Sequence, residues 1–353
     1  MRRLGFLAAY LIPGLTLAGY FIGGWGFALT PLFVFGALPA LDWLVGRYPV
    51  NAPESTYKRI KDDPFFHWIT WLYVPIQWAL VVWACSVAAS GRLTSWELAG
   101  FLISVGLASG GVGITIAHEL GHRSNRWEQF LAKTLLTSVS YTHFFIEHNQ
   151  GHHARVATPG DPASARFGES FFRFYPRTVF GSYFSAWHLE TKRLAKKGHR
   201  IWSGQNQMLQ FAFCILACAL SLGWAFGWVA PLFFFAQSVV AFTLLELVNY
   251  VEHYGLERRQ LGSGRFEKVR PVHSWNASET VTNAFLFNLQ RHSDHHAHAN
   301  RRYQTLRHFD ESPQLPTGYA GMILLALLPP LWRRVMDPKV ARYQAALAPQ
   351  SGM

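Results

Sequence analysis

Long apolar stretches alternate with short polar ones along the first third of the chain and return after residue 209. An apolar stretch of about 20 residues is long enough to cross a bilayer as a helix. Six stretches predict such spans, at about 4–24, 28–46, 67–89, 97–117, 210–228 and 229–250. Consecutive spans pair into three hairpins. We therefore expect an all-α integral membrane protein in which residues 1–353 form a single membrane-embedded domain.

The remaining sequence predicts a cap on one face of the bundle, built from residues 118–209 and 251–353. Within it, 128–147 is apolar with basic and histidine residues interspersed, and we expect one helix on or dipping into that face. A seventh span there would carry the C-terminal histidines to the other side. Residues 317–336 predict an interfacial or re-entrant helix.

Composition agrees with a membrane protein, since only 15% of residues are charged against about 25% in soluble domains. The net charge of +12 is unevenly placed. The turns within the three hairpins hold one basic residue, Arg92, and the other 31 of the 32 Lys and Arg fall on the opposite side. By the positive-inside rule, both termini and the cap are cytoplasmic. The charge thus reflects topology and anionic lipid rather than nucleic acid, for which no motif is present.

The three cysteines, Cys85, Cys214 and Cys218, lie in apolar spans, and no C-x-x-C occurs. The chain therefore carries no thiolate iron centre of its own.

Nine of the sixteen histidines fall in four clusters that the predicted topology brings to the cytoplasmic boundary of the bundle. The clusters are His118 and His122; His148, His152 and His153; His253; and His292, His295 and His296. Neutral imidazole suits iron, zinc, copper and nickel. Nine imidazoles are too many for one ion and fit two ions with four or five nitrogens each. His253 is the weakest of them on spacing alone.

The spacing within the clusters suggests how the ions are shared. Residues i and i+4 of an α-helix lie on one face. Three pairs have this spacing and can each chelate one ion: His118/His122, His148/His152 and His292/His296. His153 and His295 would then point about 100° around the helix, toward the other ion.

Each cluster also contains a carboxylate beside a histidine. Metal-bound imidazoles usually donate their second N–H to a carboxylate or a carbonyl. The candidates for this role are Glu119, Glu147, Glu252 and Asp294, with Glu246 and Asn249 on the preceding turns.

The first cluster has a second interpretation, because His118-Glu119-Leu120-Gly121-His122 fits the H-E-x-x-H signature of zinc proteases. In a protease Glu119 would be the general base. Such a site needs three protein ligands and one open position. It would leave six clustered histidines unexplained, so we favour the dinuclear interpretation.

The histidine boxes resemble those of the integral-membrane desaturase and hydroxylase superfamily. Longer strings, from about Thr115 to Tyr319, are similar to the alkane 1-monooxygenases: "HELGHR", "EHNQGHHARVATPGDPASARFGES", "NYVEHYGLERR" and "FNLQRHSDHHAHANRRYQTLRHF". The xylene side-chain monooxygenases share much of this pattern, but the glutamates in "EHNQGHH" and "NYVEH" favour the alkane branch. A fatty-acyl desaturase or hydroxylase would use the same boxes.

The resemblance implies a non-haem diiron site held by the nine histidines, with no haem, flavin or Fe–S cluster in this chain. It implies terminal hydroxylation of medium-chain n-alkanes by O2 in a bacterial inner membrane, with electrons from rubredoxin and its NADH-dependent reductase. An alkane dissolved in the bilayer would enter a channel that we expect spans one, two, three and six to line. Six arginines around the cap could steer an acidic donor, or they could instead bind lipid headgroups or support the histidine loops: Arg155, Arg166, Arg258, Arg259, Arg301 and Arg302.

Overall fold

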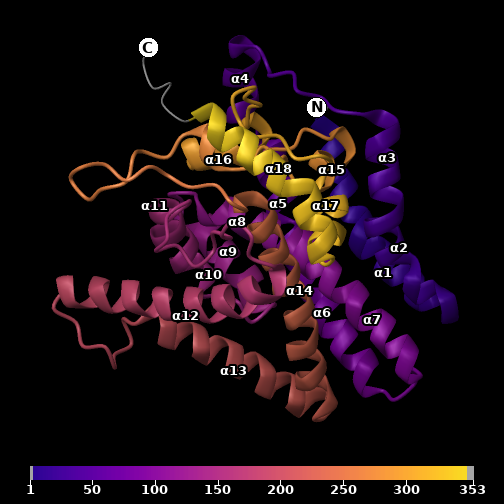
Figure 1. The fold of residues 1–353 in the computed structure, drawn as a ribbon. Coiled ribbons are helices and arrows are strands. Elements are labelled where there is room, and N and C mark those ends of the chain that lie inside the picture. The colour runs from indigo at the N-terminus through magenta and orange to yellow at the C-terminus, as the bar shows by residue number, and fades with distance from the viewer. Residues whose placement is uncertain (1–2, 348–353) are drawn as a thin grey trace, which may run out of the picture.

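The computed structural model describes residues 3–347, and within that range every regular element is a helix (Figure 1). Six helical spans are long and apolar enough to cross a membrane: Arg3–Ile22, Gly24–Val45, Pro64–Ala89, Ser95–Gly121, Gln207–Phe226 and Val229–His253. The all-helical, six-span prediction is confirmed. The fourth and sixth spans continue past their predicted ends, so that His118 and His253 belong to the spanning helices themselves.

Several spans are composite. The first combines a 3-10 helix with α1 (Leu11–Ile22), the third combines α5 (Pro64–Trp71) with α6 (Tyr73–Ala89), and the fifth and sixth are single helices, α13 (Gln207–Phe226) and α14 (Val229–His253). The second consists of a 3-10 helix, α2 (Leu29–Leu32), a π-helix over Phe33–Ala37 and α3 (Leu38–Val45). Pro31 and Pro39 help to explain these breaks, because proline lacks the amide hydrogen that a regular helix needs.

The fourth span begins as α7 (Ser95–Leu107), continues as a π-helix over Ala108–Ile114 and ends as α8 (Thr115–Gly121). At Gly113 a β-carbon would lie 1.7 Å from Oε1 of Gln77 on α6. Gln77 in turn donates from Nε2 to Oγ of Ser138 at 2.6 Å. The π-helix thus packs the backbone of Gly113 directly against the buried amide of Gln77. This amide connects the third span to the cap through Ser138.

The turns of the three hairpins lie at the end of the bundle away from the C-terminal helices α16–α18 (Figure 1). One of these turns joins α13 to α14 at Gly227, whose φ of 88° is a conformation that residues with a side chain rarely adopt. Helix α14 is central, since α6, α7, α12, α13 and α17 all pack against it.

The cap lies at the other end of the bundle. Its helices are α4 (Glu54–Lys61), α9 (Arg126–Thr137), α10 (Phe144–Ile146), α11 (His153–Arg155), α12 (Phe171–Lys196), α15 (Thr280–Phe285), α16 (His292–Ala297), α17 (Tyr319–Ala326) and α18 (Pro329–Leu347). Short 3-10 turns cover Pro271–His273 and Tyr303–Thr305, and a π-helix covers Glu147–His152.

Two expectations for the cap are wrong. The stretch 128–147 is not one helix: α9 ends at Thr137, Ser140 takes a left-handed φ of 51°, and the chain turns into α10. The stretch 317–336 is also divided, because Pro329 and Pro330 start a new helix and disfavour α conformation in the residue before them. Its first part, α17, is packed against α14.

Candidate metal centre

The nine clustered histidines meet at the boundary between the bundle and the cap and form two groups. The five-histidine group is His118, His122, His148, His153 and His295. The four-histidine group is His152, His253, His292 and His296. Within each group one donor atom from every residue lies within 4.8 Å of all the others. Residues separated by almost 180 positions therefore converge on two small volumes.

The distances fit metal coordination. Neighbouring ε2 nitrogens are 3.0–3.4 Å apart in the five-histidine group and 2.9–3.3 Å apart in the four-histidine group. Metal–nitrogen bonds of about 2.1 Å at angles of about 90–109° place ligand nitrogens about 3.0–3.4 Å apart. A neutral imidazole has a single N–H, so mutual hydrogen bonding alone cannot account for so many ring nitrogens facing one another. The donor set fits two ions that prefer nitrogen.

The second cluster divides differently from the prediction. His148 pairs with His153, their ε2 nitrogens 3.1 Å apart, and His152 points to the other group. The i,i+4 pairing of His148 with His152 is therefore wrong. The reason is the π-helix over Glu147–His152, in which residues five apart, not four, come into register.

The other clusters follow the α-helical expectation. His118 of α8 and His122, the residue that caps this helix, belong together, as do His292 and His296 of α16. His295 points to the five-histidine group, as its offset on the helix predicts. His253, uncertain on spacing alone, is fully buried in the four-histidine group.

The environment keeps three of these imidazoles, those of His148, His295 and His296, neutral. Burial, reinforced by neighbouring imidazoles, holds the pKa of His148, His295 and His296 well below its ordinary value. A neutral ring keeps the lone pair that a metal ion requires.

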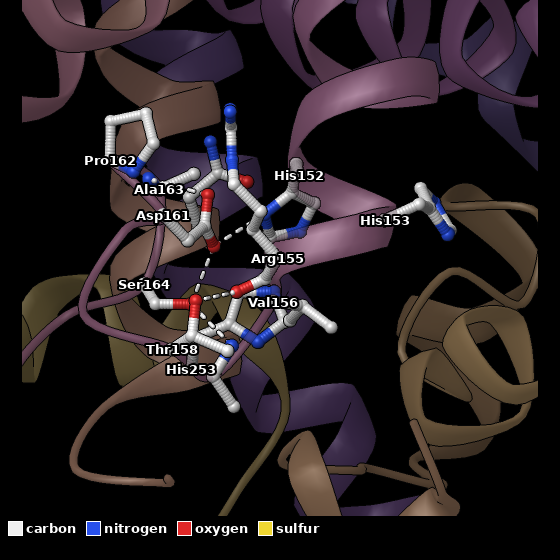
Figure 2. Close-up of polar contacts among 12 residues, drawn as sticks. His152, His153, Arg155, Val156, Thr158, Asp161, Pro162, Ala163, Ser164 and His253 are labelled. Carbon is white, nitrogen blue, oxygen red and sulfur yellow. Dashed lines mark hydrogen bonds and ion pairs between the residues drawn. The ribbon is translucent and has the colours of Figure 1, made fainter. Parts of the chain in front are cut away.

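One buried carboxylate makes the contact expected of a metal-supporting residue, and the sequence interpretation missed it. Asp161, in the loop after α11, has Oδ2 2.8 Å from Nδ1 of His152 (Figure 2). Ser164 donates to the same oxygen at 2.6 Å, and the amide of Ala163 donates to Oδ1. Although burial alone would raise the pKa of Asp161, His152 and Ser164 lower it, so the residue stays a carboxylate. Figure 2 also shows His153 pointing away from this contact.

Three of the carboxylates predicted to orient the clustered imidazoles contact arginines instead of those nine rings, although Asp294 also lies 2.9 Å from Nδ1 of His298. Glu119 pairs with Arg123 at 3.1 Å, Glu147 pairs with Arg155 at 2.6 Å, and Asp294 is bridged by Arg301. Asp294 also accepts from the amide of Arg307, so it organises the loop after α16. The pairing of Glu119 also argues against its use as a protease base.

Glu246 and Asn249 form a separate contact inside the bundle. Glu246 accepts from Tyr141 and Thr178 at 2.8 Å and from Nδ2 of Asn249 at 3.1 Å. Its carboxylate is thus occupied by three neutral donors.

Glu252 approaches the metal-facing side of a histidine. Its Oε2 is 3.0 Å from Nε2 of His292, the nitrogen that also faces His253 and His296. Tyr319 donates to Oε1 at 2.7 Å. Glu252 therefore lies beside the volume that the four-histidine group encloses, not behind an imidazole as expected.

Four of the six cap arginines are engaged within the chain, which favours a supporting role for them. Arg155 pairs with Glu147, Arg258 donates to the carbonyls of Ala154 and Glu267, Arg301 pairs with Asp294, and Arg302 pairs with Glu128. Arg166 and Arg259 are exposed.

A narrow apolar cavity of about 80 Å³ leads to both groups. At about 10–15 Å³ for each water-sized position, it has room for a slender molecule. His118, His148 and His292 lie in its wall, followed by aliphatic and aromatic side chains. The first, second, fourth and sixth spans line it, together with α15 and α17. The expectation that the third span lines it is wrong: the π-helix of the fourth span, with Gly110 and Gly111, takes that place.

Comparison with known proteins gives consistent matches. Residues 94–326 match the family model for fatty acid desaturases. Alkane 1-monooxygenase 1 of Pseudomonas aeruginosa is 47% identical over 323 residues, 91% of this chain and 84% of that protein. Alkane 1-monooxygenase 2 of Alcanivorax borkumensis is 40% identical over 352 residues, 97% of this chain and 92% of that protein. The xylene/toluene monooxygenase hydroxylase component XylM of Pseudomonas putida is 29% identical over 336 residues, 92% of this chain and 86% of that protein.

Proposed function

The chain belongs to the alkane 1-monooxygenases, and we propose that it hydroxylates the terminal carbon of medium-chain n-alkanes at a non-haem diiron site. The reaction consumes an alkane, O2, two electrons and two protons and yields a 1-alkanol and water. The observation that carries the proposal is the apolar cavity whose wall includes histidines of both groups.

The cavity supplies what an alkane needs. The substrate has no polar group to recognise, so its binding rests on apolar burial, which contributes about 0.8 kcal/mol per methylene. A narrow slot favours an extended chain that presents its end. Leu38, Leu107 and Leu244 are among the side chains that would surround the chain, and the terminal carbon would lie near His118 and His292.

The nine histidines would hold the two ions, five at one and four at the other. Bound iron would supply the O2 activation and oxidising power that an inert primary C–H bond requires. The protein's residues would bind and orient the substrate and exclude water, and burial keeps His148, His295 and His296 neutral. Asp161 would hold His152 through Nδ1 and so leave Nε2 free to bind an ion.

Electrons would come from rubredoxin, which its NADH-dependent reductase would reduce. The exposed Arg166 and Arg259 are better candidates for steering an acidic donor than Arg155, Arg301 and Arg302, because their charge is not neutralised by a carboxylate partner in residues 3–347. The concentration of basic residues on the cap side supports a cytoplasmic cap in a bacterial inner membrane. Residues 1–353 would act as one domain, since both groups need ligands from both cap segments.

The test combines metal analysis with product analysis. Purified protein should contain about two iron ions per chain by this proposal, and with rubredoxin, its reductase, NADH and octane it should form 1-octanol. Xylene and a fatty-acyl substrate serve as competing substrates in the same gas-chromatographic assay. A desaturated acyl product, or active protein containing zinc and no iron, would refute the proposal.

A further inference from the structure

A second cavity, of about 690 Å³, lies where three spans end. Arg3, at the start of the first span, lines it together with Tyr48, just after the second, and Asp63, just before the third. Because the ends of spanning helices mark the membrane surface, the cavity lies at the level of lipid headgroups. Helix α4 and the loop after Val45 form its outer wall.

The wall is strongly basic. Four arginines and one aspartate line the cavity: Arg3, Arg59, Arg291, Arg307 and Asp63. Asp63 is paired with Arg3 at 3.1 Å, so it cannot neutralise the others. Glu54, outside the lining, pairs with Arg307 at 2.7 Å. Arg59 and Arg291 have no carboxylate partner in residues 3–347, and this surplus gives the cavity a positive potential that attracts an anion.

Buried polar atoms in the same wall lack partners. Oδ1 of Asn283, Oε1 of Gln304 and Nε of Arg291 form no hydrogen bond with any residue in 3–347. These side chains are between 2% and 8% exposed, so bulk water reaches them poorly. Unpaired buried donors and acceptors are rare and costly. With Nε of Arg307, the wall therefore offers two donors and two acceptors without partners in the described residues to whatever fills the cavity.

We propose that this cavity binds the phosphate diester of an anionic phospholipid whose headgroup also carries hydrogen-bond donors, as phosphatidylglycerol does. Guanidinium groups suit phosphate because their N–H donors match its oxygens in pairs. The glycerol hydroxyls would donate to Asn283 and Gln304. Phe6, Phe66 and Leu306 provide apolar wall for the start of the acyl chains.

The site adjoins the metal centre through a shared partition. Helix α15 turns Thr282 and Phe285 to the apolar cavity and Thr280 and Asn283 to the basic one. After it, Arg291 borders the basic cavity and the adjacent His292 belongs to the four-histidine group. A bound headgroup would brace the segment that carries three histidines.

The experiment titrates lipid into delipidated, iron-loaded protein in mild detergent and counts bound lipid by native mass spectrometry. The probes are phosphatidylglycerol, phosphatidylcholine and inorganic phosphate. The test variant is R59A/R307A. The control is R265A/K268A, which removes the same charge from an exposed loop. A second variant, N283D, keeps the side chain's shape and its acceptor for a glycerol hydroxyl but adds a negative charge to the cavity that should repel an anionic lipid.

We expect one phosphatidylglycerol per chain, bound at least about tenfold more weakly by R59A/R307A and N283D than by the wild type and the control, as loss of charge-assisted contacts predicts. Weaker binding of phosphatidylcholine is expected. If only inorganic phosphate bound more weakly to the two test variants, the cavity would be an anion site but not a site for a phospholipid. Equal binding of every probe by all four proteins, with their melting temperatures unchanged, would mean a water-filled cavity and overturn the proposal.

Discussion

Asp161 offers the sharpest test of how the metal centre is built. Its carboxylate is 2% exposed and contacts His152 at 2.8 Å and Ser164 at 2.6 Å. The change Asp161→Asn keeps the size and one acceptor but removes the charge. A charge-assisted hydrogen bond contributes about 1.5–3 kcal/mol and a neutral one about 0.5–1.5 kcal/mol. The difference, about 1–1.5 kcal/mol, corresponds to a roughly five- to tenfold loss of affinity for the ion in the four-histidine group.

The change Asp161→Ala should cost more, because it also leaves Nδ1 of His152 buried without a partner. Removing such a contact typically lowers metal affinity by about 10–100-fold. The assay is metal content after dialysis against increasing chelator, followed by the melting temperature of the metal-free proteins. The loss of metal should affect mainly one of the two ions. It should increase from the wild type to Asp161→Asn and again to Asp161→Ala.

The matched control is Glu190→Gln on α12. Glu190 is also buried and paired with a basic side chain, Arg193, at 2.6 Å, but belongs to no histidine contact. The Glu190→Gln variant should retain both ions at every chelator concentration at which the wild type retains them. The reasoning is refuted if both Asp161 variants retain metal as the wild type does, or if the control loses as much.

Three further predictions concern the site and its walls. His295→Ala and His296→Ala should each lower iron content and abolish most octanol formation, because they take ligands from different groups; full activity of either variant would contradict the dinuclear site. Gly111→Val should shift products toward shorter alkanes at an unchanged melting temperature, because a β-carbon there enters the apolar cavity with no contact closer than 3.6 Å; an unaltered decane-to-octane product ratio would count against it. Gly113→Ala should destabilise the protein by about 1–3 kcal/mol, because the new β-carbon would overlap Gln77. Adding Gln77→Ala should restore part of the lost stability, as measured by thermal unfolding. If it restored none, this contact would not be the cause.

The six spans and the convergence of the nine histidines could be predicted from the sequence, for physical reasons. Apolar length is required by the bilayer, and local helical spacing correctly paired His118 with His122 and His292 with His296. These properties depend on short-range pattern, which a sequence displays directly.

Other features depend on contacts or conformations that spacing does not reveal. His148 and His152 have the same i,i+4 spacing as the other pairs, but a π-helix separates them. Asp161 lies nine residues beyond His152 in an irregular loop, so only the folded loop identifies it as the partner. One signal was present, because "TPGDPASAR" falls within a string that resembles the family.

The distribution of ligands along the chain has a consequence for biosynthesis. Up to residue 291 the five-histidine group has four of its members, and the four-histidine group has only His152 and His253. Helix α16 supplies the fifth histidine of the five-histidine group and the last two histidines of the four-histidine group. Neither group can be completed while the ribosome is still translating the preceding spans. Both sets of histidines are therefore complete only after the sixth span has been translated, and a chain truncated or stalled before α16 lacks three of the nine imidazoles.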